Sequence, residues 1–276
     1  MSSAPALSQR GLTWLQALTG QQGLAATGPR TVRVADAPLG AETARYIAVV
    51  PDAGNRFPRA RQGEVGVDEA WALARHVRAT LTADQGVRAR PIVAIVDVTS
   101  QAYGRREELL GIHLAAAAAV DAYASARLAG HPVIALLVGK AISGGFLCHG
   151  YQANRILALD SPEVLVHAMS KQAAARVTRR TVEEVESLGE RIVPMAYDVR
   201  SFARLGLVHK LIEGINAEAP VGADVERVRA ELIAAIADAR GGSRDLAQRL
   251  RSAAAREIRA ASIEVRRRLS EQWNAS

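Results

Sequence analysis

Residues 139–150, GKAISGGFLCHG, combine small residues with polar groups directly after an apolar segment, residues 132–138. The apolar segment predicts a buried strand, and paired glycines after a strand indicate that the backbone itself comes close to something. A chain that leaves a strand and begins a helix directs free backbone N–H groups past the strand end. Such groups suit an anion or a developing oxyanion. Ser143, Gly144 and Gly145 are therefore the first candidates for chemistry, although a structural turn in which only glycine fits explains them equally well.

Other chemistries at this segment are disfavoured by the residue order. No GxGxxG pattern is present, and Lys140 precedes the glycines instead of following them, so a nucleotide-phosphate loop is disfavoured. Ser143 follows Ala-Ile and has no assigned base, which fits neither a nucleophile elbow nor a triad. Cys148 also lacks an obvious base, so we interpret it as a small buried residue rather than a nucleophile.

The elements that must position this segment alternate between strands and helices. Strands are predicted at residues 46–50, 91–98, 132–138 and 155–159, and the second of these is apolar on both faces, as in a covered parallel sheet. Helices are predicted at residues 12–18, 67–82, 109–128, 181–200, 197–208 and from 223 onward, with a break at 241–242. Ser161-Pro162-Glu163 also has the composition of a helix start.

This alternation predicts an α/β fold with parallel strands and right-handed crossovers. We find no internal repeat and no low-complexity linker. We therefore expect one domain over residues 1–276, with a core at about 30–215 and a helical annex at about 216–276.

Composition narrows the class of protein. The 276 residues are 49% hydrophobic and 23% charged, and no apolar run has the ~18–20 residues that a membrane span needs. The N-terminal residues lack a secretory pattern, and the single Cys148 excludes an internal disulfide and fits a reducing compartment. A cytoplasmic protein is expected.

The net charge of +7 invites a nucleic-acid interpretation, which other features disfavour. The arginines of the C-terminal part alternate with acidic residues at helical spacing, and aromatic residues make up only 4% of the chain. We expect a solvated helix face. An acidic partner protein or a phosphate-bearing ligand stays open.

Several separated segments resemble one family. Residues 132–150 are similar to the oxyanion-hole region of the carboxyltransferase branch of the crotonase superfamily, and residues 91–126 are similar to its preceding βα unit. Residues 51–71 and 150–180 resemble the gamma subunit of biotin-independent malonate decarboxylase. The resemblance covers roughly residues 10–215, and the C-terminal helical part matches less distinctively.

The resemblance implies a crotonase-like spiral of ββα units with a helical C-terminal annex. It also implies a malonyl-thioester decarboxylase that works as part of a hetero-oligomer. The malonyl and acetyl thioesters would be carried on a phosphopantetheine-type arm of an acyl-carrier subunit, or on coenzyme A as an analogue. A homologous beta subunit would share the active site, and neither biotin nor a metal nor another covalently bound cofactor would take part.

The resemblance also assigns roles to residues. Backbone N–H groups of Gly144 and Gly145, beside Ser143, would hold either the thioester oxygen of the enolate formed when CO2 leaves or the departing carboxylate, and the partner subunit would supply another such hole. A loss of one such donor typically costs about 3 to 4 kcal/mol. The proton for the carbanion would come from a side chain or from water that it holds. The candidate donors are Tyr103, His149 and Tyr151, although His149 could equally be bonded to a backbone carbonyl behind the turn.

Further residues are expected around this site. The expected lining residues are Gln101, Gly104 and Ile142, and Asp97 is expected to cap or brace the loop after its strand. The residues expected to meet the arm's phosphate or the carrier's acidic surface are Arg56, Arg59 and Arg61, which could instead face solvent or the partner subunit. Lys171 and Arg176 are expected on the helix after Ser161-Pro162, facing the interface.

Three alternatives stay open. A carboxyltransferase or hydratase subunit of the same fold would change the substrate, and a hydratase could use Glu107 and Glu108 to handle water. A non-catalytic scaffold subunit would only stabilise its partner and dock the carrier protein. A basic nucleic-acid binder would show salt-sensitive DNA affinity.

Overall fold

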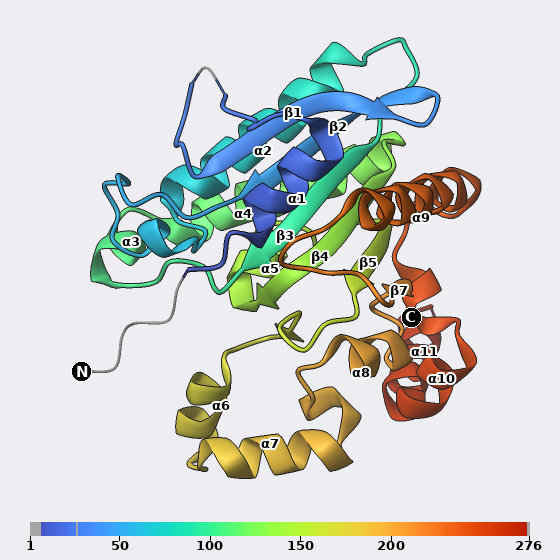
Figure 1. The fold of residues 1–276 in the computed structure, drawn as a ribbon. Coiled ribbons are helices and arrows are strands. Elements are labelled where there is room, and N and C mark those ends of the chain that lie inside the picture. Colours follow the sequence, from blue (N-terminus) through green and yellow to red (C-terminus); the bar gives the residue numbers. More distant parts are fainter. Residues whose placement is uncertain (1–6, 26, 275–276) are drawn as a thin grey trace.

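A seven-stranded sheet lies at the centre of the computed structural model, which describes residues 7–25 and 27–274 (Figure 1). Its order is β1-β2-β3-β4-β5-β7, with the short β6 paired to the end of β4. β1 and β2 form an antiparallel hairpin, whereas the other neighbours pair in parallel. The strands are β1 (Val32–Leu39), β2 (Glu42–Val49), β3 (Ile92–Val98), β4 (Val133–Ile142), β5 (Arg155–Leu159), β6 (Val166–His167) and β7 (Lys210–Ile212).

Helices cover both faces of this sheet. α2 and α4 pack against each other on one face, and α1 and α9 pack on the other (Figure 1). β3 is buried along its whole length because it lies between these two layers. The helices are α1 (Arg10–Thr19), α2 (Val67–Ala83), α3 (Arg105–Leu109), α4 (Ile112–Ala129), α5 (Ser143–Cys148), α6 (Lys171–Thr178), α7 (Val182–Arg191), α8 (Val199–Arg204), α9 (Gly222–Gly241), α10 (Ala253–Ile258) and α11 (Ala260–Asn274).

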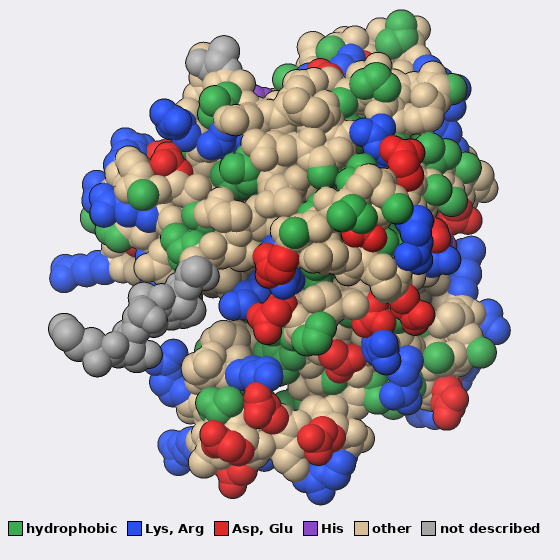
Figure 2. All heavy atoms as spheres, viewed as in Figure 1, with side chains coloured by type: hydrophobic (Ala, Val, Ile, Leu, Met, Phe, Trp, Pro, Cys, Tyr) green, Lys and Arg blue, Asp and Glu red, His purple; other side chains and the backbone are tan. Residues whose placement is uncertain are grey.

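α6 and α7 form a helical hairpin that projects from one end of the sheet (Figure 1). A capping box formed by Thr181 and Glu184 begins α7. The Thr181 side chain accepts a hydrogen bond from the Glu184 N–H, and the Glu184 carboxylate accepts one from the Thr181 N–H. The hairpin has its own small apolar cluster, which includes Val185, Tyr197 and Ile142 at the end of β4. Acidic and basic side chains are interspersed over its outer surface (Figure 2). The hairpin is thus anchored to the strand that leads into residues 143–145.

The predicted strands and the helix at residues 67–82 are confirmed, with two extensions. The strand predicted at residues 46–50 begins earlier, at Glu42, because it pairs with β1 over its whole length. β4 does not end at residue 138 but continues to Ile142, because Ala141 and Ile142 pair with Val166 and His167 of β6. The hairpin strand β1 was not predicted.

Several helix predictions are wrong in detail. The helix predicted at residues 181–200 ends at Arg191, and the one predicted at residues 197–208 is limited to α8, Val199–Arg204. Ser161-Pro162-Glu163 forms a turn, in which the Val164 N–H donates to the Ser161 carbonyl, and the chain then enters β6. The next helix, α6, starts after Ser170, whose side chain accepts from the Ala173 N–H. The helix predicted from residue 109 is interrupted at Gly111, whose φ of 78° ends one helix and starts α4.

Candidate active site

The turn at residues 143–145, which we call the glycine turn, joins β4 to α5. Ser143 has a φ of 59°, in the left-handed region that non-glycine residues seldom adopt. Such a conformation costs about 1 to 3 kcal/mol and is found mostly at functional sites. The turn lies at the carboxyl end of the buried central strands, where α/β folds place their ligands.

The glycines are needed because the turn packs directly on the loop after β3. A Cβ atom on Gly145 would overlap with the backbone carbonyl of Ser100, and one on Gly144 would lie 2.8 Å from Gln101 Oε1. Gln101 Oε1 accepts hydrogen bonds from the Gly144 N–H at 2.8 Å and from Ser143 Oγ at 2.9 Å. The close approach inferred from the paired glycines is therefore made to the neighbouring loop. A ligand oxygen can use the Gly144 donor only after the Gln101 side chain has moved aside.

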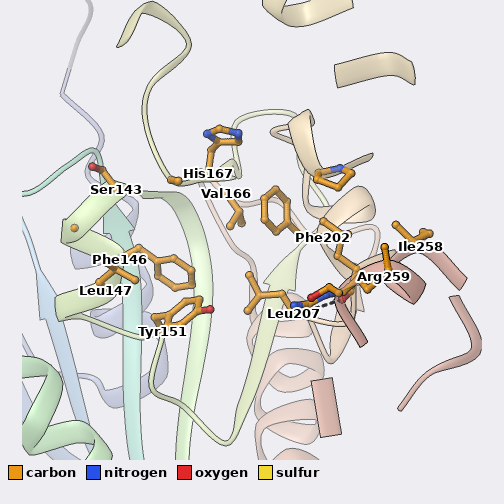
Figure 3. Close-up of a pocket in the computed structure, with 16 residues that line it drawn as sticks. Ser143, Phe146, Leu147, Tyr151, Val166, His167, Phe202, Leu207, Ile258 and Arg259 are labelled. Atoms are coloured by element: carbon orange, nitrogen blue, oxygen red, sulfur yellow. Dashed lines mark hydrogen bonds between the residues drawn. The ribbon is translucent and has the colours of Figure 1, made fainter. Parts of the chain in front are cut away.

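An apolar chamber of about 600 Å³ adjoins the glycine turn (Figure 3). This volume is typical of a small-molecule site. No Asp or Glu is among the described residues that border it. The lining residues come from widely separated parts of the chain: Ser143, Gly144, Phe146, Leu147, Tyr151, Val166, His167, Ala168, Pro194, Phe202, Leu205, Leu207, Ile258, Arg259, Ala261 and Ser262.

His167 is the imidazole that borders this chamber. It lies in β6, and β6 pairs His167 with Ile142, the residue before the glycine turn. Its ring stacks on Tyr197, with centroids 4.0 Å apart. Burial lowers the pKa of His167, although contact with the Met169 carbonyl opposes that shift.

His149, expected as a proton donor, lies behind the turn and away from the chamber. It is fully buried, with Nδ1 3.0 Å from the Tyr123 hydroxyl and Nε2 2.9 Å from the Ile95 carbonyl. Burial lowers the pKa of His149 to about 4. Both ring nitrogens are therefore engaged, as in the alternative interpretation of a histidine bonded to a backbone carbonyl.

Tyr151 and Tyr103, the other expected donors, lie in different places. Tyr151 lines the chamber and meets Phe146 edge-on, at 5.6 Å between ring centroids. Tyr103 is outside the chamber, 46% exposed, with the Arg59 guanidinium 4.1 Å above its ring. Gly104, expected beside it, is also outside the chamber lining.

The arginines of the loop before α2 are paired on the surface. Arg59 bonds to Glu64 at 2.5 Å, and Arg56 bonds to Asp68 at 2.8 Å. The guanidinium of Arg61 donates to the Asn55 carbonyl. None of these three is among the residues that line the chamber. The structure thus bonds Gln101 to Ser143 and Gly144, places Tyr151 in the chamber that these two residues border, and leaves the arginines apart. Gln101 and Ile142, which were expected to line the site, are not among the chamber's lining residues.

The remaining expected residues have structural surroundings. The Asp97 carboxylate accepts from the Lys140 N–H at 3.1 Å and from Ser8 Oγ, so it braces the ends of β3 and β4. Cys148 is buried, and this raises the pKa of its thiol to about 12. Lys171 lies on α6, where it pairs with Glu186 at 2.6 Å, and Arg176 lies on the same helix. Within residues 7–25 and 27–274, no three His, Cys, Asp or Glu side chains are grouped as metal ligands would be.

Sequence reasoning missed His167 and the walls of the chamber. Phe202, Leu207, Ile258 and Arg259 belong to short helices and turns far from the glycine turn in sequence. No local pattern marks them, because only tertiary packing brings them to the same cavity.

Comparisons with known proteins agree with this arrangement. The chain matches the family described as malonate decarboxylase gamma subunit over residues 60–273. A Pseudomonas malonate decarboxylase hetero-tetramer in complex with coenzyme A contains a chain that is 57% identical, with 96% of this chain and 99% of that chain covered and a TM-score of 0.91. A chain of the Pseudomonas malonate decarboxylase MdcD-MdcE hetero-dimer is 55% identical, with 96% of this chain and 100% of that chain covered and a TM-score of 0.89.

A curated relative has a related chemistry. The malonyl-S-ACP:biotin-protein carboxyltransferase MADD of Malonomonas rubra is 38% identical over 194 residues, which are 68% of this chain and 66% of that protein. The similarity to these proteins confirms the predicted crotonase-like α/β fold. By its match over most of its length, the chain belongs to the malonate decarboxylase gamma subunit family.

Proposed function

We propose that this chain, paired with a homologous beta subunit, decarboxylates a malonyl thioester carried on an acyl-carrier subunit. The products are CO2 and the acetyl thioester. The observation that carries the proposal is the glycine turn at the wall of an apolar chamber in a member of this family. The names of the relatives support the thioester: one acts on malonyl-S-ACP, and another was solved with coenzyme A.

Decarboxylation requires that the negative charge of the enolate is stabilised and that the charge of the carboxylate is lost as CO2 leaves. When the C–C bond to the carboxylate breaks, its electron pair forms an enolate whose charge lies on the thioester oxygen. Backbone N–H groups at Gly144 and Gly145 are suited to that oxygen once the Gln101 side chain has moved away from the Gly144 N–H. The apolar walls disfavour the carboxylate more than neutral CO2, because a charged group loses more hydration there.

The remaining expectations follow from this role. The thioester would be held on a phosphopantetheine-type arm, with neither biotin nor a metal taking part. The arginines at 56 and 59 lie outside the chamber, so a contact with the carrier's surface suits them better than a contact with the acyl group. The single buried Cys148 suits the reducing cytoplasm as the compartment. We keep a single domain over residues 1–276 as part of this proposal.

A carboxyltransferase is the second candidate, because the curated relative transfers its carboxyl group to a biotin protein. A hydratase has less support, since Glu107 and Glu108 do not border the chamber and no other described carboxylate does.

The test is CO2 release from malonyl-CoA by this chain alone, by its beta subunit alone and by the mixture. We expect release by the mixture only, and avidin should leave it unchanged because no biotin takes part. Inhibition by avidin, or a requirement for a biotinylated protein, would favour the carboxyltransferase. Equal release by the beta subunit alone would leave this chain as a scaffold.

A further inference from the structure

His167 is placed next to the glycine turn by the sheet itself. β6 is only two residues long, and its parallel pairing puts Val166 beside Ala141 and His167 beside Ile142. Ser143 directly follows Ile142, the last residue of β4, and it lines the same chamber as His167. In Figure 3, Ser143 and His167 lie toward one end of the chamber, with Tyr151 and Leu207 toward the other. An acyl group held at the turn would therefore share the chamber with this imidazole.

The ring is held in one orientation by contacts on its face and its edge. Tyr197 stacks on the face with an interplanar angle of 16°. Nδ1 lies 3.0 Å from the Met169 carbonyl oxygen and 3.2 Å from the Met169 nitrogen, so the backbone engages this edge. Nε2 has no bonding partner among the described residues, which leaves it available to a bound molecule. A fixed ring with one engaged and one available nitrogen is the arrangement that proton transfer by histidine requires.

Charged side chains of both signs lie on the elements next to the ring: Lys171 pairs with Glu186, and Asp198 follows Tyr197 in the chain. Tyr197 covers its face, and Lys171 Nζ of α6 lies 5.6 Å from the centroid of the Tyr197 ring. Tyr151 and Arg259 border the same chamber. Burial favours the neutral ring and lowers its pKa from the ordinary value of 6.5, although contact with the Met169 carbonyl opposes that shift. The imidazolium form is consequently a stronger acid than free histidine, and the neutral form predominates near pH 7.

We propose that His167 is a catalytic residue that transfers the proton at the α-carbon of the acyl thioester, an inference that rests on the proposed function. In the decarboxylation direction, the enolate carbon takes the proton from Nε2 of the imidazolium, so a C–H bond forms and the N–H bond breaks. The ring is left neutral and regains a proton from water. In the reverse sense, neutral Nε2 takes an α-proton from an acetyl thioester and leaves the enolate at the glycine turn.

The reverse step gives a test that does not depend on decarboxylation. The complex of this chain with its beta subunit is incubated with acetyl-CoA in D2O, and deuterium in the acetyl methyl group is followed by mass spectrometry. Release of CO2 from malonyl-CoA is measured on the same samples. The variant is His167→Asn, which keeps a polar side chain but cannot transfer protons, and the matched control is His113→Asn at an exposed histidine of α4.

We expect His167→Asn to lower both rates by about 100-fold or more, with KM within about threefold of the wild type. His113→Asn should leave both rates unchanged. A second variant, His167→Ala, should regain part of its activity when imidazole is added, which a purely structural defect would not show. Intact elution of each complex by size-exclusion chromatography verifies assembly.

The pH profiles of the two rates test the role of His167 most directly, because deuterium exchange needs the neutral imidazole and decarboxylation needs the imidazolium. Exchange needs neutral Nε2, so its rate should rise as the pH rises through the His167 pKa. The protonation step of decarboxylation needs the imidazolium, so kcat should fall over the same range. Both slopes should be absent in His167→Asn.

The outcomes separate the two proposals. Exchange or decarboxylation by His167→Asn within about threefold of the wild type, with the wild-type pH slope, overturns the role of His167. If the wild-type complex exchanges deuterium in a His167-dependent way but releases no CO2, the role of His167 stands and the proposed decarboxylase function fails. A wild-type complex that does neither overturns both.

Discussion

At the scale of residues, the two glycines of the turn are constrained to different degrees. Gly145 faces a backbone carbonyl, which cannot move without shifting the loop after β3, whereas Gly144 faces the end of the flexible Gln101 side chain. The turn therefore requires glycine more strictly at position 145 than at position 144. Gly144 has room to change if the Gln101 amide turns away.

Gly145→Ala should therefore lower kcat for malonyl-CoA in the assembled complex by about 100-fold, because the added Cβ displaces the backbone donors of the turn. The matched control is Gly222→Ala at the start of α9, where nothing lies near an added Cβ. Steady-state kinetics of both complexes make the comparison. Full activity of Gly145→Ala in an intact complex would contradict the proposed oxyanion site and favour the scaffold alternative.

The histidines show how far sequence reasoning reaches at this scale. His149 stands out in sequence because it comes shortly after the glycines, directly after α5, yet it is buried in the core and bonds to Ile95 and Tyr123. His167 is 24 positions after Ser143 in the sequence (167 minus 143) and becomes its neighbour only through the pairing of β6 with β4. Nearness in sequence therefore identified the turn and Gln101's loop, but not the imidazole.

At the scale of elements, the α6–α7 hairpin supports the site through its small apolar cluster. Val185 of α7 is fully buried in this cluster together with Tyr197, whose ring stacks on His167. Tyr197 is also deeply buried, which raises its pKa to about 12. The packing of a peripheral hairpin and the orientation of a chamber residue are thus coupled.

Val185→Ala should cost on the order of 2 kcal/mol of local stability, since it removes two buried methyl groups and leaves a cavity. Amide hydrogen exchange should become faster in α6 and α7 and stay unchanged in β3 and β4. Uniformly faster exchange across the sheet would mean that the hairpin unfolds only with the whole chain. Ala173→Gly, a substitution on α6 outside the cluster, controls for effects on helix propensity alone.

The main elements were predictable because their patterns are local. Apolar runs and helical periodicity located the central strands and α2. The helix start predicted after β5 was wrong because Ser161-Pro162 has the composition of a helix start as much as Ser170 does. The pairing of β6 with β4 decides between the two positions. A two-residue strand such as β6 has no periodicity of its own to detect.

At the scale of the whole molecule, the C-terminal helices complete the chamber. Ile258 of α10 and Ala261 of α11 form a wall facing Phe202 and Leu207, which precede β7. Arg267 on the outer part of α11 pairs with Glu264 at 2.7 Å, as expected for a solvated helix face. The annex thus contributes Ile258, Ala261 and Arg259 to the chamber and carries further charged residues elsewhere.

Ala261→Phe should raise the KM for malonyl-CoA by roughly tenfold or more, because changes of even one methylene are felt in a hydrophobic pocket. The neighbouring Ala260→Phe places the same ring at an exposed position of α11 that does not line the chamber, and should leave KM unchanged. Both variants should melt at similar temperatures. Equal KM values for the two would mean that the substrate does not enter this chamber.

The separate origins of the turn and of the chamber's far wall have a consequence for how such proteins diversify. The glycine turn, which we propose to stabilise the enolate, packs on the loop after β3, where a Cβ on Gly145 would meet the backbone and one on Gly144 the Gln101 side chain. The residues that shape the cavity include those of α10 and α11, which pack at the margin of the fold. Mutations in these two helices can therefore alter which acyl group is accepted while the enolate chemistry is inherited intact.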